Sequence, residues 1–185
     1  MNLPNKLTIL RMLMVPVFVF FLLTDINGAG RLRDFLALGF FIAADLTDFL
    51  DGYIARKYDL VTNFGKFMDP LADKLLVGSA IICLVALDRL PAWIAVVIIG
   101  REFIISGFRL VASDRGIVIA AGKLGKTKTT VQVFMVGFLI AHFEGTVWHI
   151  AEQVLIYAAL LLTVISVIGY IWNNREVLKD DSSGK

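Results

Sequence analysis

The sequence predicts an all-α integral membrane protein with six transmembrane helices. Of its 185 residues, 58% are hydrophobic and only 18% are charged, whereas soluble proteins average about 25% charged residues. The mean hydropathy is +0.78, and long apolar runs alternate with short polar breaks along the chain. A chain of this length is expected to fold as one domain. We place that domain at residues 1–175, followed by a polar C-terminal tail at residues 176–185.

Six apolar stretches are each long enough to cross a membrane, which takes a helix of about 20 residues. The first and the last contain long runs without charge, whereas the middle four contain charged residues that a lone helix in lipid would not tolerate. The polar segments TDINGAG, DRLPA and FEGT separate several of these stretches and contain turn-forming residues. The six predicted helices cover residues 5–24, 34–56, 66–88, 91–112, 124–142 and 147–172.

The lysine and arginine residues predict the orientation of these helices, because basic residues concentrate on the cytoplasmic side of membrane proteins. With six helices and a cytoplasmic N-terminus, the outer loops contain only Arg31, Arg33 and Arg89, which leaves 15 of the 18 basic residues on the inner side. We therefore expect a multi-pass protein of the plasma membrane with both termini in the cytoplasm. The charged residues of the second to fifth helices then lie in the cytoplasmic half of the membrane.

Two pairs of aspartates lie where the second helix ends and the third begins. Asp48 and Asp51 are three residues apart, and Asp69 and Asp73 are four apart, so each pair shares one face of a helix. Clustered carboxylates repel one another and are costly to desolvate, and oxygen ligands suit hard divalent cations. The pattern predicts a site for one cation or for two bridged cations. The alternative is that the acids pair with the basic residues beside them at a wet membrane surface.

The residues between the two pairs suit a phosphate-containing ligand. Gly52 and Ala55 are small and allow a ligand to approach the helix closely, and Arg56 offers a planar fork to phosphate oxygens. Mg²⁺ commonly completes its coordination shell with substrate phosphates. A metal-dependent phosphoryl-type reaction at the inner membrane surface is therefore expected, with one aspartate available as a general base for an alcohol.

The spacing D-x-x-D-G-x-x-A-R-x8-G-x3-D-x3-D resembles the signature of the CDP-alcohol phosphatidyltransferase family, and all eight fixed positions are present. These positions are Asp48, Asp51, Gly52, Ala55, Arg56, Gly65, Asp69 and Asp73. The resemblance implies six transmembrane helices, a homodimer and a Mg²⁺ or Mn²⁺ site, with two ions, at the cytoplasmic end of the second and third helices. It also implies transfer of a phosphatidyl group from CDP-diacylglycerol to an alcohol, with release of CMP.

Matching positions imply the role of each residue. The four aspartates would hold the metal, and Asp73 would also act as the catalytic base. The residues that would bind CDP are Gly52, Ala55, Arg56 and Gly65. Asp45 lies one turn before Asp48 and is not part of the family pattern.

Three further stretches resemble the bacterial members of the family that use glycerol 3-phosphate as the acceptor. These are LPNKLTILR at residues 3–11, GREFIISGFRL at 100–110 and GKLGKTKTT at 122–130. The last of them is not a nucleotide-binding P-loop, because that motif would require glycine where this chain has Ala120. The resemblance therefore implies that phosphatidylglycerophosphate and CMP are the products.

The basic residues in these stretches agree with a phosphorylated acceptor. Arg101 and Arg109 are eight residues apart, about 80° around a helix, so both can face one groove. Lys126 and Lys128 lie near the start of the fifth helix, where free backbone N–H groups favour phosphate. We expect these four residues to bind glycerol 3-phosphate, with Glu102 as an internal partner for one of the arginines. Each basic residue could instead only anchor its helix at the membrane surface.

Two other functions stay open. The same chemistry could act on another acceptor, such as inositol phosphate, serine or phosphatidylglycerol. The acids could also belong to a divalent-cation transporter, although the Gly-x-x-Ala-Arg insert has no obvious purpose in transport. No alternation of basic and aromatic residues suggests nucleic acid as a partner. His142 and His149 fall at the outer side, far from the aspartates, where interfacial roles are expected.

Overall fold

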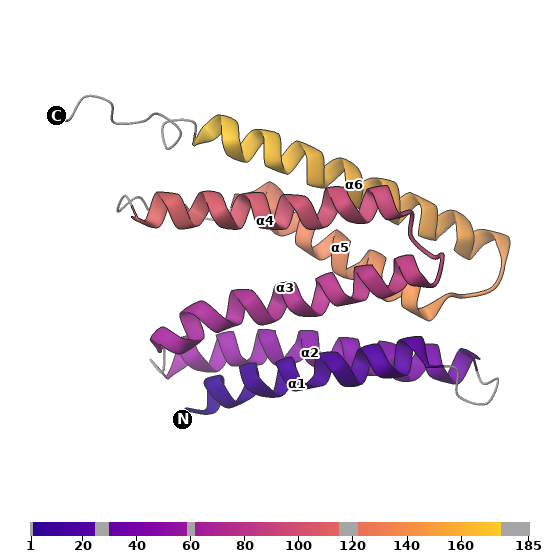
Figure 1. Ribbon diagram of the computed structural model, residues 1–185, viewed down its shortest axis with the longest axis horizontal. Coiled ribbons are helices and arrows are strands. Elements are labelled where there is room, and N and C mark those ends of the chain that lie inside the picture. Colours follow the sequence, from indigo (N-terminus) through magenta and orange to yellow (C-terminus); the bar gives the residue numbers. More distant parts are fainter. Residues whose placement is uncertain (1, 25–29, 59–61, 115–121, 175–185) are drawn as a thin grey trace. The chain divides into compact units, whose positions relative to one another are not determined.

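The computed structural model describes residues 2–24, 30–58, 62–114 and 122–174, and these residues form helices without strands (Figure 1). The helices are α1 (Leu3–Leu23), α2 (Gly30–Lys57), α3 (Asn63–Ala86), α4 (Ala92–Asp114), α5 (Lys123–Ala141) and α6 (Thr146–Asn173). The predicted all-α class is confirmed, and each observed helix end lies within four residues of the predicted one. The predicted tail at 176–185 lies outside the described residues.

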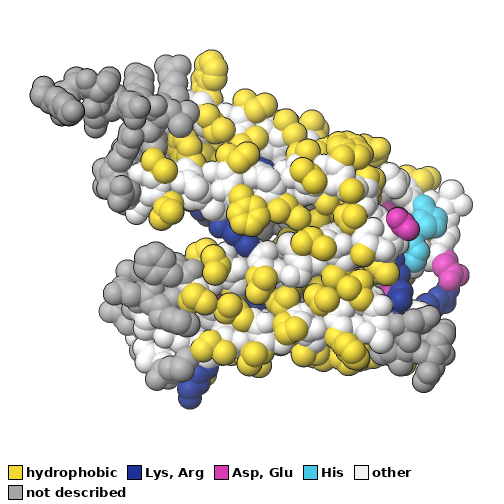
Figure 2. All heavy atoms as spheres, in the orientation of Figure 1, with side chains coloured by type: hydrophobic (Ala, Val, Ile, Leu, Met, Phe, Trp, Pro, Cys, Tyr) yellow, Lys and Arg dark blue, Asp and Glu magenta, His cyan; other side chains and the backbone are white. Residues whose placement is uncertain are grey.

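Among the described helices, only α1 and α6 are both long enough and apolar enough to cross a membrane by length and composition. The other four have 19 to 28 residues, so charge, rather than length, distinguishes them from α1 and α6. Large apolar side chains are nevertheless exposed on the middle helices, including Val96 at 70% and Phe103 at 69% on α4. Figure 2 shows such side chains spread over the visible helix surfaces, as expected for helices that contact lipid.

The chain divides into two compact units, which we describe separately. The first comprises Met1–Pro91 and Val136–Glu152, and the second comprises Ala92–Met135 and Gln153–Lys185. The helices α1, α2 and α3 lie entirely in the first unit and α4 lies entirely in the second, whereas α5 and α6 each contribute to both.

In the first unit, α1 packs against α2 and α3. The second half of α1 buries Val15, Phe18 and Leu22, whose spacing of three and four residues keeps them on one face. The Phe18 ring lies 5.9 Å from that of Phe41 on α2, measured between centroids. This end of the first unit is therefore held together by close apolar packing.

A buried arginine joins three segments of the first unit. Arg89, in the turn after α3, donates hydrogen bonds from NH1 to the carbonyl oxygens of Leu139 (3.2 Å) and Ile140 (3.0 Å). These carbonyls lie in the last turn of α5, where no intrahelical donor is available. The NH2 group of Arg89 donates to Asp34 near the start of α2 at 2.7 Å. Arg89 therefore caps α5 and neutralises a buried carboxylate at the same time.

In the second unit, α4 and α6 pack through an aromatic contact. Phe108 and Ala112 of α4 are buried, and Tyr170 of α6 packs against them. The rings of Phe108 and Tyr170 meet edge to face, with centroids 5.7 Å apart and an interplanar angle of 78°. This geometry is favourable for aromatic pairs, and it fixes the tyrosine ring relative to α4.

Candidate active site

The first half of α1 buries polar side chains on the face that its second half uses for apolar packing. Asn5, Thr8 and Arg11 are spaced three residues apart and are 8%, 1% and 0% exposed. Buried polar groups are unfavourable unless they find hydrogen-bonding or ionic partners. Their partners lie on α2 and in the segment that begins α3, and these partners include three of the four predicted aspartates.

Arg11 binds the first aspartate pair. Its NH1 group donates to Oδ1 of Asp48 at 2.5 Å, and its NH2 group forms an ion pair with Oδ2 of Asp51. The side chain of Asp51 is only 3% exposed, whereas that of Asp48 is 45% exposed. The planar guanidinium thus spans two carboxylates on successive turns of α2, an arrangement to which an arginine fork is well suited.

Thr8 binds the second pair through Asp69. The Thr8 hydroxyl donates to Oδ1 of Asp69 at 2.6 Å. Nearby, Thr62 caps α3, because its Oγ1 accepts a hydrogen bond from the Gly65 N–H group at 3.0 Å. The Thr62 hydroxyl also donates to Oδ1 of Asn5 at 2.8 Å. One face of α1 therefore organises the start of α3 as well as the end of α2.

Gly65 makes this convergence possible. A Cβ atom at this position would lie 3.3 Å from Oγ1 of Thr62, 3.4 Å from Oδ2 of Asp69 and 3.5 Å from Oδ1 of Asn5. Three polar atoms, one from α1 and two from the start of α3, would thus surround any side chain placed there. This close approach gives a physical reason for glycine at position 65, and its predicted part in CDP binding stays a prediction.

The positions of the remaining motif residues are given by the helices that contain them. Asp73 lies on α3 one turn beyond Asp69, and Gly52 and Ala55 are partly buried on α2 close to Asp51. The backbone of Arg56 lies in α2, but its side chain is outside the described residues.

The donor set of this cluster fits a divalent metal by its chemistry. Within the described part of the chain, no three His, Cys, Asp or Glu side chains converge in a group that would hold a metal ion. Instead, the guanidinium of Arg11 bridges the two aspartates of α2. The two aspartates of α2 thus bind one buried cationic group, the guanidinium of Arg11. Their carboxylate oxygens are also the ligands that Mg²⁺ and Mn²⁺ prefer.

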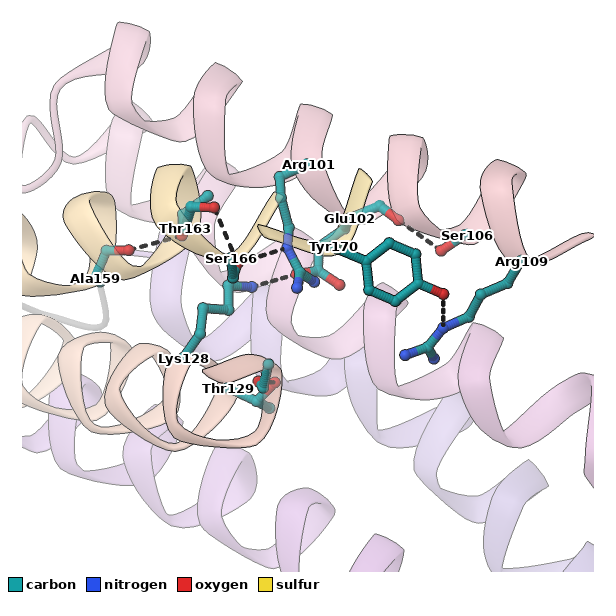
Figure 3. A network of polar contacts seen from close by, with 11 residues as sticks. Arg101, Glu102, Ser106, Arg109, Lys128, Thr129, Ala159, Thr163, Ser166 and Tyr170 are labelled. Carbon is teal, nitrogen blue, oxygen red and sulfur yellow. Dashed lines mark hydrogen bonds and ion pairs between the residues drawn. The ribbon is translucent and has the colours of Figure 1, made fainter. Parts of the chain in front are cut away.

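A second polar cluster occupies the second unit (Figure 3). Lys128 of α5 is 1% exposed, and its ammonium group forms an ion pair with Oε1 of Glu102 on α4. The same carboxylate oxygen accepts a hydrogen bond from NH1 of Arg101 at 3.2 Å. The expectation that Glu102 pairs with an arginine is therefore confirmed, and the carboxylate serves Lys128 as well. These three side chains together carry one net positive charge.

Helix α6 contacts both arginines of α4. The Nε group of Arg101 donates to Oγ of Ser166 at 3.2 Å, and that of Arg109 donates to the hydroxyl oxygen of Tyr170 at 3.1 Å. The guanidinium carbon of Arg109 also lies 5.6 Å from the centre of the tyrosine ring, within the range of a cation–π contact. The fourth predicted basic residue, Lys126, is exposed near the start of α5.

Several of these residues had no assigned role in the sequence analysis. They are Asn5, Thr8 and Arg11 on α1, and Ser166 and Tyr170 on α6. A signal was present in both helices: the polar residues of α1 recur every third position, and Ser166 and Tyr170 are four apart in an apolar helix. Such spacings place polar groups on one face, although they do not reveal which partners that face meets.

Comparisons with known proteins agree with the motif. The family model described as CDP-alcohol phosphatidyltransferase matches residues 1–165. A CDP-diacylglycerol–glycerol-3-phosphate 3-phosphatidyltransferase of Bacillus subtilis (strain 168) is 45% identical, covering 96% of this chain and 97% of its own. The enzyme of the same name from Rickettsia felis is 38% identical over 91% and 93% of the two chains. A probable phosphatidylglycerophosphate synthase of Mycobacterium tuberculosis (strain CDC 1551 / Oshkosh) is 43% identical over 92% and 80%. With the family matched over most of its length and all eight motif positions filled, this chain belongs to the CDP-alcohol phosphatidyltransferase family.

Proposed function

We propose that this protein transfers the phosphatidyl group of CDP-diacylglycerol to glycerol 3-phosphate, giving phosphatidylglycerophosphate and CMP. The observation that carries this proposal is the likeness to relatives named for this reaction, which reaches 45% identity and covers 96% of this chain. The complete aspartate motif supports the reaction type, and the basic cluster around Glu102 supports a phosphorylated acceptor.

The aspartates would hold Mg²⁺ or Mn²⁺, most simply two ions shared by Asp48, Asp51, Asp69 and Asp73. When bound, the metal would neutralise the pyrophosphate of CDP-diacylglycerol and polarise the reacting phosphorus. The contribution of the chain itself is to orient the carboxylates. Arg11 holds Asp48 and Asp51, and Thr8 holds Asp69.

The CDP group would bind along α2 beside the aspartates. Gly52 and Ala55 leave room for the nucleotide close to the helix backbone, and Gly65 keeps the start of α3 free of a side chain. Arg56 would offer its guanidinium to a phosphate oxygen, as the motif implies. The acyl chains of the substrate would stay in the lipid.

Asp73 would act as the general base. Its carboxylate takes the proton from the 1-hydroxyl of glycerol 3-phosphate, and the oxygen then attacks the phosphorus that carries diacylglycerol. A phosphorus–oxygen bond to glycerol forms as the pyrophosphate bond breaks, and CMP leaves with the bonding electron pair. The proton later passes from Asp73 to solvent.

Four basic residues would bind the phosphate of the acceptor: Arg101, Arg109, Lys126 and Lys128. The bonds to α6 use the Nε groups of the two arginines. The bond from Arg109 to Tyr170 does not involve the terminal nitrogens of Arg109. Two terminal nitrogens of an arginine match the spacing of two phosphate oxygens.

We further propose that all six helices cross the plasma membrane of a homodimeric protein, with the active site and both termini in the cytoplasm. The asymmetric distribution of lysine and arginine supports this orientation. The apolar character of α1 and α6 supports a membrane location.

The proposal is tested with purified protein, CDP-diacylglycerol, labelled glycerol 3-phosphate and Mg²⁺ or Mn²⁺. We expect release of CMP and a labelled lipid that migrates as phosphatidylglycerophosphate on thin-layer plates. Asp73→Asn should fold normally and lose turnover. Absence of CMP release with every acceptor would refute the reaction. Product formed only with serine, inositol phosphate or phosphatidylglycerol would keep the chemistry and change the substrate.

A further inference from the structure

Helix α6 presents a row of polar side chains on an otherwise apolar surface. Thr163, Ser166 and Tyr170 are spaced three and four residues apart and therefore share one face. Thr163 is 0% exposed and Ser166 is 4% exposed. In an apolar environment each hydroxyl needs a hydrogen-bonding partner. Ser166 and Tyr170 accept hydrogen bonds from arginines of α4, whereas the Thr163 hydroxyl donates to a backbone carbonyl of α6.

Ser166 is oriented as an acceptor. Its hydroxyl donates to the backbone carbonyl oxygen of Thr163 at 2.9 Å, so its single hydrogen is used within α6. The oxygen then receives the hydrogen bond from Nε of Arg101 at 3.2 Å. Among the described residues, the side chain of Thr163 bonds within α6 alone, donating to the carbonyl oxygen of Ala159 at 2.7 Å. Figure 3 shows Ser166 between Thr163 and Arg101.

Tyr170 is held rigidly on the same face. Its ring packs edge to face on Phe108, with ring centroids 5.7 Å apart, as part of the cluster that Phe108 forms with buried Ala112. Its hydroxyl oxygen receives the hydrogen bond from Nε of Arg109 at 3.1 Å. The tyrosine therefore fixes both the distance and the direction of the Arg109 side chain.

The two contacts share one geometry. Each arginine of α4 donates its Nε group to an oxygen of α6, and this hydrogen bond restricts the orientation of the guanidinium. For Arg101, the NH2 group lies 3.8 Å from the position that a Cβ atom on Gly125 would take. Gly125 belongs to the first turn of α5, where unpaired backbone N–H groups favour an anion.

We infer that Ser166 and Tyr170 are positioning residues that set the affinity for the phosphorylated acceptor by aiming Arg101 and Arg109. This inference rests on the proposed function, in which those arginines bind glycerol 3-phosphate. It assigns α6 a part in acceptor recognition. A long arginine side chain loses rotamer freedom when it binds, and a hydrogen bond that fixes it beforehand reduces that loss.

The test compares Ser166→Ala and Tyr170→Phe with matched controls. Each variant removes one oxygen, and Tyr170→Phe keeps the ring that packs on Phe108. We expect the KM for glycerol 3-phosphate to rise about fivefold in Ser166→Ala and about threefold in Tyr170→Phe, since the bonds are to charged donors and the second is exposed. The kcat and the KM for CDP-diacylglycerol should stay within about twofold.

The controls are Thr163→Val and Tyr157→Phe, which remove the same groups from α6 without touching an arginine. Thr163 bonds within its own helix, and Tyr157 is 57% exposed. Both should leave the KM for glycerol 3-phosphate unchanged. A rise of equal size in the controls would overturn the inference.

A double-mutant cycle tests whether each residue acts through its arginine. Tyr170→Phe should have no further effect on the KM for glycerol 3-phosphate in an Arg109→Ala background, and the same should hold for Ser166→Ala with Arg101→Ala. A full effect in those backgrounds would overturn the inference, as would parallel rises in the KM of both substrates. If the unmodified protein releases no CMP with glycerol 3-phosphate, the proposed function fails and this inference fails with it.

Discussion

Arg11 is the residue on which the charge balance of the aspartate cluster depends. It is completely buried and bonds to Asp48 and Asp51, of which Asp51 is also buried. Removal of one partner from a buried ion pair leaves an uncompensated charge, which typically costs about 3–5 kcal/mol. A metal ion bound to the same carboxylates would offset part of that loss.

We therefore predict that Arg11→Met strongly lowers the melting temperature of the metal-free protein in detergent, and that added Mn²⁺ restores part of it. The measurement is a thermal unfolding curve with chelator and with Mn²⁺. Lys6→Met provides the control, because Lys6 is an exposed basic residue on the same helix. An equal loss of stability in both variants would mean that the buried ion pair contributes little.

Gly65 offers a second prediction at the scale of one residue. Alanine normally stabilises a helix interior relative to glycine by about 1 kcal/mol. At Gly65, however, the new methyl would lie 3.4 Å from Oδ2 of Asp69 and 3.3 Å from Oγ1 of Thr62. We expect Gly65→Ala to keep most of its stability and to lose at least about tenfold in kcat/KM, because the carboxylate must shift.

The matched control for this variant is Gly78→Ala. Gly78 also lies on α3, but a Cβ atom there would meet nothing within 4 Å. This variant should be as active as the unmodified protein and slightly more stable. Equal CMP release by Gly65→Ala and Gly78→Ala would show that the space at Gly65 is not needed for the reaction.

At the scale of the helix, the sequence was sufficient to predict where the elements lie but not which faces meet. The turn-forming segments and the lengths of the apolar runs predicted all six helices. The motif predicted Asp48, Asp51 and Asp69 as a group, and the structure connects all three to α1 through Arg11 and Thr8. The role of α1 and α6 was missed because a few polar residues in an apolar helix give weak local signals. Their partners are distant in sequence, as with Arg101 and Ser166.

Helices α4 and α5 are joined by Glu102, whose carboxylate serves two cations. Lys128 is 1% exposed and Arg101 is mostly buried. Glu102→Leu would remove the carboxylate that both buried cations share, whereas Lys128→Met would leave Glu102 paired with Arg101. We predict a loss of stability of about 3–5 kcal/mol for Glu102→Leu and a clearly smaller loss for Lys128→Met.

Thermal or denaturant unfolding in detergent measures this order. The double variant Glu102→Leu/Lys128→Met should be more stable than Glu102→Leu alone, because it also removes a buried charge that Glu102 balances. Glu144→Gln serves as a control, since its ion pair with Arg31 is formed by side chains that are 76% and 72% exposed, and such pairs contribute little. Greater loss in Lys128→Met than in Glu102→Leu would contradict the role assigned to Glu102.

At the scale of the whole molecule, each of the two units contains its own cluster of buried charge. The carboxylate cluster belongs to the first unit and the basic cluster to the second. One substrate of the proposed reaction carries a pyrophosphate and the other a phosphate, and each cluster suits one of these groups. With six alternating spanning helices, α2 and α4 would run across the membrane in the same direction. The proposed topology is therefore compatible with the proposed chemistry.

The topology leads to a labelling prediction in intact cells. In a Cys83→Ala background, which removes the single native cysteine, new cysteines are introduced at Glu144 and at Lys57. Glu144 lies between α5 and α6, and Lys57 is an exposed residue at the end of α2. Six spans with a cytoplasmic N-terminus place the first outside and the second inside. A membrane-impermeant maleimide should therefore label Glu144→Cys in intact cells and Lys57→Cys only after lysis. Inverted labelling would place the aspartates outside the cell, and labelling of both sites in intact cells would mean that the two positions do not lie on opposite sides of the membrane.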